Sequence, residues 1–81
     1  MRTSVYSLKK VLFEGEAKEI NCKTAQGEIT VLDHHRPLIT MLVKGSIKII
    51  DTGEKEHYLN VNSGFLEVNS KNESKLIVEE E

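Results

Sequence analysis

The feature that most limits the fold of this chain is an alternation of apolar and polar residues with a period of two. The alternation is clear in short runs such as Ser46–Asp51, around Ile47 and Ile49, and Lys55–Val61, around Leu59. Successive side chains of a β-strand point to opposite faces, so this period indicates half-buried strands rather than helices. Turn residues separate the runs at intervals of about ten residues, which predicts an all-β sandwich or barrel.

We expect about eight short strands in a small antiparallel β-sandwich or flattened barrel that forms one domain over residues 1–81. The first strand is predicted to lie at a sheet edge, the strand from Leu38 to be buried on both faces, and Glu79–Glu81 to form a solvated acidic tail. The expected strands are Val5–Leu8, Ala17–Thr24, Glu28–Leu32, Leu38–Val43, Ser46–Asp51, Lys55–Val61, Phe65–Asn69 and Lys75–Val78. Bends or turns are expected at Glu14–Glu16, Thr24–Gly27, Lys44–Gly45, Thr52–Glu54, Asn62–Gly64 and Asn69–Ser74.

Charge and cysteine content narrow the class of protein. The chain has 11 basic and 13 acidic residues, a net charge of −2 and no basic stripe, which argues against a nucleic-acid-binding protein. Cys22 is the one cysteine, so an intrachain disulfide is excluded; we expect a reducing compartment and a cysteine buried in the core. With no signal-peptide or transmembrane pattern, a soluble cytoplasmic domain is expected, and docking onto a membrane complex stays open.

The loop Asp33–Pro37 holds the residues that most resemble a catalytic or metal site. His34 and His35 are adjacent, so on an extended chain they point to opposite sides and are poorly placed to share one ion. His57 is the one other histidine, and a tetrahedral site would need distant carboxylates. No serine lies in a nucleophile elbow and no glycine-rich phosphate loop is present, so we predict a non-enzymatic binding or scaffold domain without cofactor or metal.

Several short motifs, in a fixed order from about Val5 to Val78, resemble the N-terminal β-sandwich domain of the epsilon subunit of F-type ATP synthase. Each motif is weak alone, and their order and spacing together carry the resemblance. The matching segments are Phe13-x-Gly15, Gly27-Glu28 followed by Pro37-Leu38 with His35 two residues before the proline, Gly45-x-Ile47-x-Ile49, and Tyr58-Leu59-x-Val61-x-Ser63-Gly64-Phe65-Leu66-Glu67-Val68.

The chain departs from the family pattern in one loop and in length. Asp33-His34 stands where the family usually has proline-glycine, and Arg36 stands where a small residue is usual. Most family members continue into a C-terminal helical hairpin, and this sequence stops where the hairpin would begin. Both a naturally short member and a shortened chain are compatible with that length.

The resemblance implies a non-catalytic rotor subunit of the central stalk. Such a subunit links the gamma subunit to the polar loops of the c ring and couples proton or sodium flow to ATP synthesis. It would be peripheral, at the cytoplasmic face of the cell membrane, and membrane-associated only through the complex. Inhibition of ATP hydrolysis depends on the hairpin in the family and is not expected of these residues.

The resemblance also implies which residues make the contacts. The expected c-ring contacts are Thr24, Ala25, Gln26, Gly27, Glu28 and His35. The expected gamma contacts are Ser7, His35 and Thr40. Two other hypotheses stay open: an independent β-sandwich binding module, since a shared fold does not fix function, and a metal-dependent enzyme that uses the three histidines.

Overall fold

In the computed structural model, which describes all 81 residues, the chain forms seven β-strands and no helix. This confirms the predicted all-β class. The strands are β1 (Arg2–Tyr6), β2 (Val11–Thr24), β3 (Gly27–Leu32), β4 (Leu38–Leu42), β5 (Gly45–Asp51), β6 (Glu56–Val68) and β7 (Glu73–Glu80).

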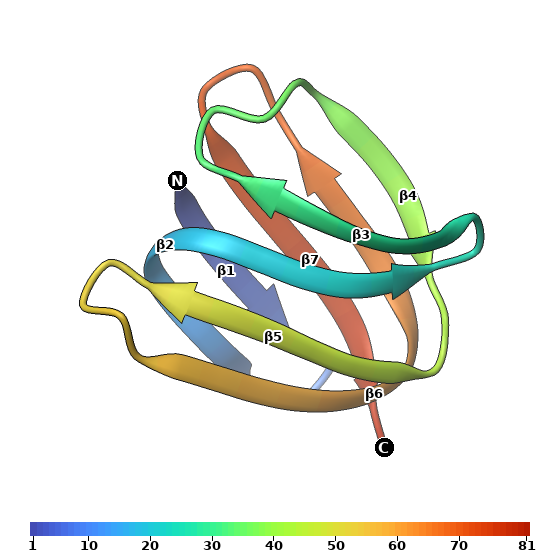
Figure 1. Cartoon of the computed structure of the whole chain (residues 1–81). Coiled ribbons are helices and arrows are strands. Elements are labelled where there is room, and N and C mark those ends of the chain that lie inside the picture. The colour runs from blue at the N-terminus through green and yellow to red at the C-terminus, as the bar shows by residue number, and fades with distance from the viewer.

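The strands form two layers that enclose one core, with β1 and β7 behind β2 and β5 in Figure 1. The front layer runs β3, β2, β5 and the first half of β6, and the rear layer runs β1, β7, the second half of β6 and β4. The long strands β2 and β6 belong to both layers, because each changes partners along its length. The result is a flattened barrel.

The structure has seven strands where about eight short ones were expected, and two expected interruptions lie inside long strands. Glu14–Glu16 pairs with β1 inside β2 and is not a bend. Asn62–Gly64 lies inside β6, where the pairing with β7 shifts between Val61 and Ser63 in a bulge. Gly64 serves close approach rather than a turn, because a Cβ there would lie 2.5 Å from the Ile77 carbonyl oxygen. In a sequence, a glycine is equally typical of a turn and of a place where another strand approaches closely.

Three further expectations need correction. The first strand is not an edge strand, because β1 pairs with β2 antiparallel and with β7 parallel, so the sandwich is also not wholly antiparallel. The strand β4 is not buried on both faces, since Ile39 and Met41 are 74% and 53% exposed. The last strand continues through Glu80, beyond the predicted start of the tail at Glu79, and the side chains of both glutamates are exposed.

Buried apolar side chains from every strand form the core. β7 shows the strict alternation, with Ser74, Leu76 and Val78 buried and the residues between them exposed. Cys22 is fully buried, as expected, and burial, with a smaller contribution from Glu28, raises the pKa of its thiol to about 11. Because fully burying one aliphatic side chain stabilises a protein by roughly 1.5–3 kcal/mol, this cluster dominates the stability of the domain. The buried apolar residues are Met1, Val5, Ala17, Ile20, Cys22, Val31, Leu42, Ile47, Ile49, Val61, Leu66, Val68, Leu76 and Val78.

A candidate contact surface at the ends of the strands

Hydrogen bonds within the turn Thr24–Gly27, between β2 and β3, fix its conformation. The Thr24 hydroxyl donates to the Gly27 carbonyl oxygen at 2.7 Å and accepts from the Gln26 amide at 3.1 Å. Gly27 has a φ of 120°, which only glycine adopts readily. Thr24 is buried, so its side chain supports the turn, and Ala25, Gln26 and Gly27 form the exposed tip.

A second set of contacts ties the same turn to β4. The Ala25 amide donates to the Met41 carbonyl oxygen at 3.1 Å. The Thr40 hydroxyl donates to the Gln26 side-chain oxygen at 3.3 Å. The structure therefore joins Thr40, an expected gamma contact, to Gln26, an expected c-ring contact.

Glu28 follows the turn on β3 and is exposed. The Asn21 side-chain amide donates to its carboxylate at 3.0 Å and to the Thr30 hydroxyl at 3.0 Å. These contacts lie at the surface and hold the Glu28 carboxylate near β2. An exposed, oriented carboxylate at the end of a hairpin can accept hydrogen bonds from a partner.

His35 does not lie beside the turn. It belongs to the loop at the other end of β3, and a six-residue strand spans about 20 Å. Its backbone amide donates to the Leu32 carbonyl oxygen at 3.1 Å, and its Nδ1 lies 2.7 Å from the Arg36 carbonyl oxygen. A carbonyl oxygen can only accept, so Nδ1 donates this hydrogen bond and Nε2 is left for a partner.

Ser7 lies in a third place, at the start of the loop between β1 and β2. Its hydroxyl accepts from the backbone amides of Lys9 and Lys10, both at 3.2 Å, and donates to the Lys10 carbonyl oxygen at 3.4 Å. Ser7 is half-buried beside the end of β7. Ser7 lines a hollow there together with Val78 and Glu79 of β7. Its hydroxyl thus shapes the loop, which the sequence pattern did not indicate.

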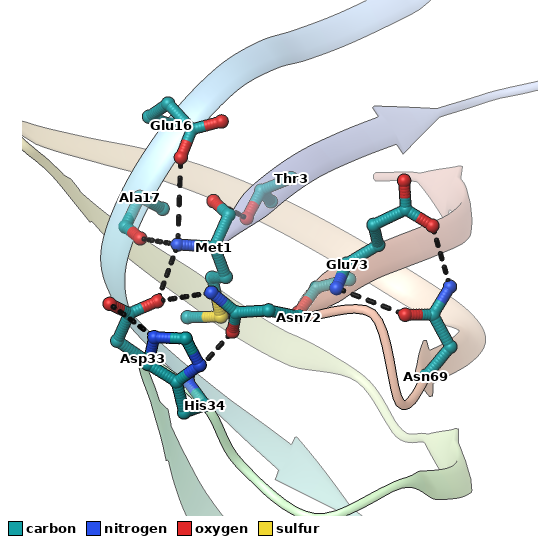
Figure 2. Close-up of polar contacts among 10 residues, drawn as sticks. Met1, Thr3, Glu16, Ala17, Asp33, His34, Asn69, Asn72 and Glu73 are labelled. Atoms are coloured by element: carbon teal, nitrogen blue, oxygen red, sulfur yellow. Dashed lines mark hydrogen bonds and ion pairs between the residues drawn. The ribbon is translucent and has the colours of Figure 1, made fainter.

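A polar cluster around the amino group of Met1 holds the loop between β3 and β4 against the rest of the sandwich (Figure 2). The ammonium group donates to the Asp33 carboxylate at 2.7 Å and to the Ala17 carbonyl oxygen at 2.9 Å, and Glu16 lies 3.7 Å away. Asn72 donates to the Asp33 carboxylate and accepts from a backbone amide of the loop, each at 2.7 Å. We call Met1, Glu16, Ala17, Asp33 and Asn72 the Met1 cluster.

The Met1 cluster explains the unusual Asp33-His34 pair. The hydrogen bond from the terminal ammonium group, and then the one from Asn72, lower the pKa of the Asp33 carboxyl to about 2. His34 has a φ of 61°, a left-handed conformation that suits glycine, and its amide donates to Asn72. His34 thus has the conformation that glycine favours, at the place where the resemblance leads us to expect a glycine.

The three histidines have separate environments. His34 lies 3.7 Å from Asp33, His35 contacts Arg36, and His57 Nε2 lies 2.9 Å from Asp51 with its ring against Phe13. The hydrogen bond from His57, followed by backbone amides, lowers the pKa of the Asp51 carboxyl. No group of three or more His, Cys, Asp or Glu side chains is arranged to hold a metal ion.

With this geometry in place, comparison with known proteins gives the family. Residues 1–80 match the model of the ATP synthase delta/epsilon chain β-sandwich domain. The chain belongs to this family. The match covers nearly the whole sequence, which confirms the resemblance drawn from the short motifs. No helix in the structure is long and apolar enough to cross a membrane.

Curated relatives carry the same family name. The ATP synthase epsilon chain of Clostridium novyi is 37% identical over 71 residues, which are 86% of this chain and 53% of the relative. That of Desulfosudis oleivorans is 38% identical over 68 residues, covering 84% of this chain and 51% of the relative. This chain therefore spans about half the length of the curated relatives it matches.

Solved structures share the fold. A chain of the Euglena gracilis mitochondrial ATP synthase, solved as OSCP/F1/c-ring, superposes with a TM-score of 0.89 at 20% identity, over 96% of this chain and 49% of that one. A chain of the Tetrahymena thermophila mitochondrial ATP synthase central stalk and c-ring gives 0.82 at 17% identity, over 99% of this chain and 63% of that one. At these identities the likeness establishes the fold.

Proposed function

We propose that this chain is an epsilon-type subunit of the ATP synthase central stalk that links the gamma subunit to the c ring. The observation that carries the proposal is the family match over residues 1–80. The solved relatives come from F1/c-ring and central-stalk assemblies, which supports a place in the rotor. In this role residues 1–81 act as one non-catalytic domain at the cytoplasmic face of the membrane, through the complex, and couple ion flow to ATP synthesis.

The local geometry suits a mechanical link. We assign the c-ring contact to the turn tip Ala25–Gly27 and to Glu28, with Thr24 holding the turn from inside. Thr40 and Ser7 are assigned to gamma, and His35 offers its Nε2 to either partner. The turn is fixed by side-chain and backbone hydrogen bonds on both sides, so its contacts are made with little loss of conformational entropy.

Co-purification with the gamma subunit of the same organism tests the proposal directly. The two chains are expressed together and separated by size-exclusion chromatography. We expect a stable one-to-one complex, because gamma is the stalk partner in the proposed assembly. Separate elution of two folded proteins, also after the c ring is added, would reject the rotor role and favour an independent β-sandwich binding module.

The variant Glu28→Lys tests the assigned c-ring surface. We expect weaker binding to the c ring and a stability unchanged within about 0.5 kcal/mol, because Glu28 is exposed. The matched control is Glu56→Lys, which makes the same charge change and also removes one exposed side-chain hydrogen bond, from Tyr58. Glu56 begins β6, at the other end of the molecule from the turn in Figure 1. Equal c-ring affinity for the two variants would contradict the placement.

A further inference from the structure

Lys23 on β2 and Glu28 on β3 lie directly opposite each other, and both side chains are exposed on the outer face of the front layer. Opposite charges in such a position normally pair, because the Cβ atoms of facing residues on neighbouring strands lie only about 4.5–5.5 Å apart. No ion pair joins the Lys23 ammonium group to the Glu28 carboxylate. The rest of the structure therefore keeps these two charges apart.

Gly45, the first residue of β5, gives the Lys23 side chain another place to lie. A Cβ atom at Gly45 would be 2.8 Å from Lys23 Cδ, and 3.5 and 3.6 Å from its Cγ and Cβ. The aliphatic stem of Lys23 thus lies against the backbone of Gly45, and β5 borders β2 on the edge opposite β3. Only glycine leaves this space, because a Cβ atom is essentially never found within 3.0 Å of such a neighbour.

Asn21, and not Lys23, is the partner of the Glu28 carboxylate. The Asn21 side-chain amide donates to Glu28 Oε2 at 3.0 Å and to the Thr30 hydroxyl at 3.0 Å. Thr30 lies directly opposite Asn21 on β3, so its hydroxyl helps to orient the amide toward Glu28. An amide is neutral, so it orients the carboxylate without cancelling its charge. The other oxygen of Glu28, Oε1, has no hydrogen-bond partner within the chain.

Lys48 is a further basic residue on this face, and it does not reach Glu28 either. It lies opposite Asn21 on β5, and it forms no ion pair. Because β2 lies between β5 and β3, Asn21 separates Lys48 from Glu28. The Glu28 carboxylate is therefore exposed, oriented and unpaired, although two lysines lie on the same face.

We propose that Asn21 and Gly45 keep the Glu28 carboxylate available to a partner. Asn21 positions the carboxylate, and Gly45 leaves the space in which Lys23 lies away from it. The partner group is a cation or another hydrogen-bond donor, because a charged carboxylate with a free oxygen binds such groups most strongly. This inference rests on the proposed contact of Glu28 with the c ring. It adds two residues that are not among the expected contacts.

Nuclear magnetic resonance of the purified, isotope-labelled chain tests the arrangement without any partner. We expect nuclear Overhauser contacts between the Lys23 δ-methylene and the Gly45 α-protons, and none between the Lys23 ε-methylene and the Glu28 γ-methylene. In Gly45→Ala the added methyl group displaces the flexible stem of Lys23, so contacts between Lys23 and Glu28 should appear. Such contacts in the wild-type chain would overturn the proposal.

Binding to the purified c ring tests the consequence for recognition. Gly45→Ala should weaken binding about two- to fivefold, the range in which exposed ion pairs act, because Lys23 then competes for the carboxylate. The double variant Gly45→Ala with Lys23→Met should restore the wild-type affinity, since methionine has similar bulk and no charge. Weaker binding caused by damage to the fold would not be reversed by Lys23→Met, so this rescue separates the two causes.

Asn21→Ala tests the positioning role and does not depend on the folding of Gly45→Ala. We expect c-ring binding to weaken about two- to fivefold, because a carboxylate side chain that is no longer held must be ordered on binding. In a Glu28→Ala background the same change should have no further effect, because Asn21 acts through Glu28. The matched control is Asn60→Ala, which removes an exposed asparagine from β6 in the same layer and should have little effect. Thermal unfolding followed by circular dichroism checks that each variant is folded.

Two binding results would also overturn the proposal. A folded double variant that binds as weakly as Gly45→Ala would exclude Lys23 as the competing group. An effect of Asn21→Ala that equals that of Asn60→Ala, or that persists in the Glu28→Ala background, would exclude positioning of Glu28. The expected contacts between Lys23 and Gly45 in a chain that does not bind the c ring would support the arrangement and reject the proposed rotor contact, so the two failures are distinguishable.

Discussion

The two sides of the sandwich are built differently. On the closed side, β1 pairs with β2 on one edge and with β7 on the other, and its residues Thr3 and Val5 are fully buried. On the open side, β3 pairs only with β2, and no Cα atom of β3 lies within 8 Å of one in β4. The expected partner contacts from Ala25 to Thr40 all lie along the open side or at its two ends.

The two sides therefore differ in role: the closed side stabilises the fold, and the open side leaves residues accessible to partners. The closed side has no free strand edge and buries its side chains, so it resists deformation. The open side leaves strand edges and loops accessible, and it is fastened at its two ends only. At one end the turn Thr24–Gly27 is hydrogen-bonded to β4, and at the other end the Met1 cluster holds the loop. Rigid ends with an accessible middle are what a binding surface needs.

A matched pair of core truncations gives the largest expected effect. Val5 and Val31 are the same residue type, both fully buried, on the closed and open sides respectively. We expect Val5→Ala to cost about 2–3 kcal/mol and Val31→Ala about 1–2, because paired neighbours on both edges prevent the cavity at Val5 from collapsing. Urea unfolding of the two variants measures the difference. Equal losses, or a larger loss for Val31→Ala, would mean that the open side is packed as firmly as the closed side.

Acid titration tests the Met1 cluster, with a smaller expected effect. The folded pKa of Asp33 is about 2, below the ordinary 3.8, so its stabilisation is complete above pH 3.8 and is lost as the pH falls toward 2. We expect Asp33→Asn to be less stable than wild type at pH 7 and to approach it at low pH. Urea unfolding across this range measures the difference in the free energy of unfolding between the two proteins. A difference that stays constant with pH would show that the Asp33 charge does not fasten the loop.

The smallest expected effect concerns His34. His34 has a left-handed conformation that costs a non-glycine residue roughly 1–2 kcal/mol, and glycine removes this cost. Glycine also raises the conformational entropy of the unfolded chain, which offsets about 0.5–1 kcal/mol of the gain. We expect His34→Gly to stabilise the domain by about 0.5 kcal/mol, since the amide that donates to Asn72 is kept. Thermal unfolding detects this shift. Destabilisation would mean that the imidazole itself, beside Asp33, contributes to the loop.

Much of the fold could be predicted from the sequence, because alternation is a local property. The period of two gave the all-β class and the burial of Cys22, and turn residues gave the hairpin at Thr52–Glu54. Glycine was ambiguous: Gly64 resembled a turn residue, yet it lies inside β6 where another strand approaches closely. Whether Gly64 lies in a turn or allows a close approach of strands depends on its contact with Ile77, which is distant in the sequence.

The sequence by itself determined the class and the residues of the turn Thr24–Gly27, since each depends on residues that are close together in the chain. It also determined the family, through the order and spacing of short motifs along residues 1–80. Only the tertiary structure decided which strands share an edge. It placed β1 between β2 and β7, brought Met1, Asp33 and Asn72 into one cluster, and aligned Met41, Phe65 and Ile77 side by side on three strands. Strand pairing sets these distances through hydrogen bonds between residues far apart in the chain, and a local pattern carries no record of them.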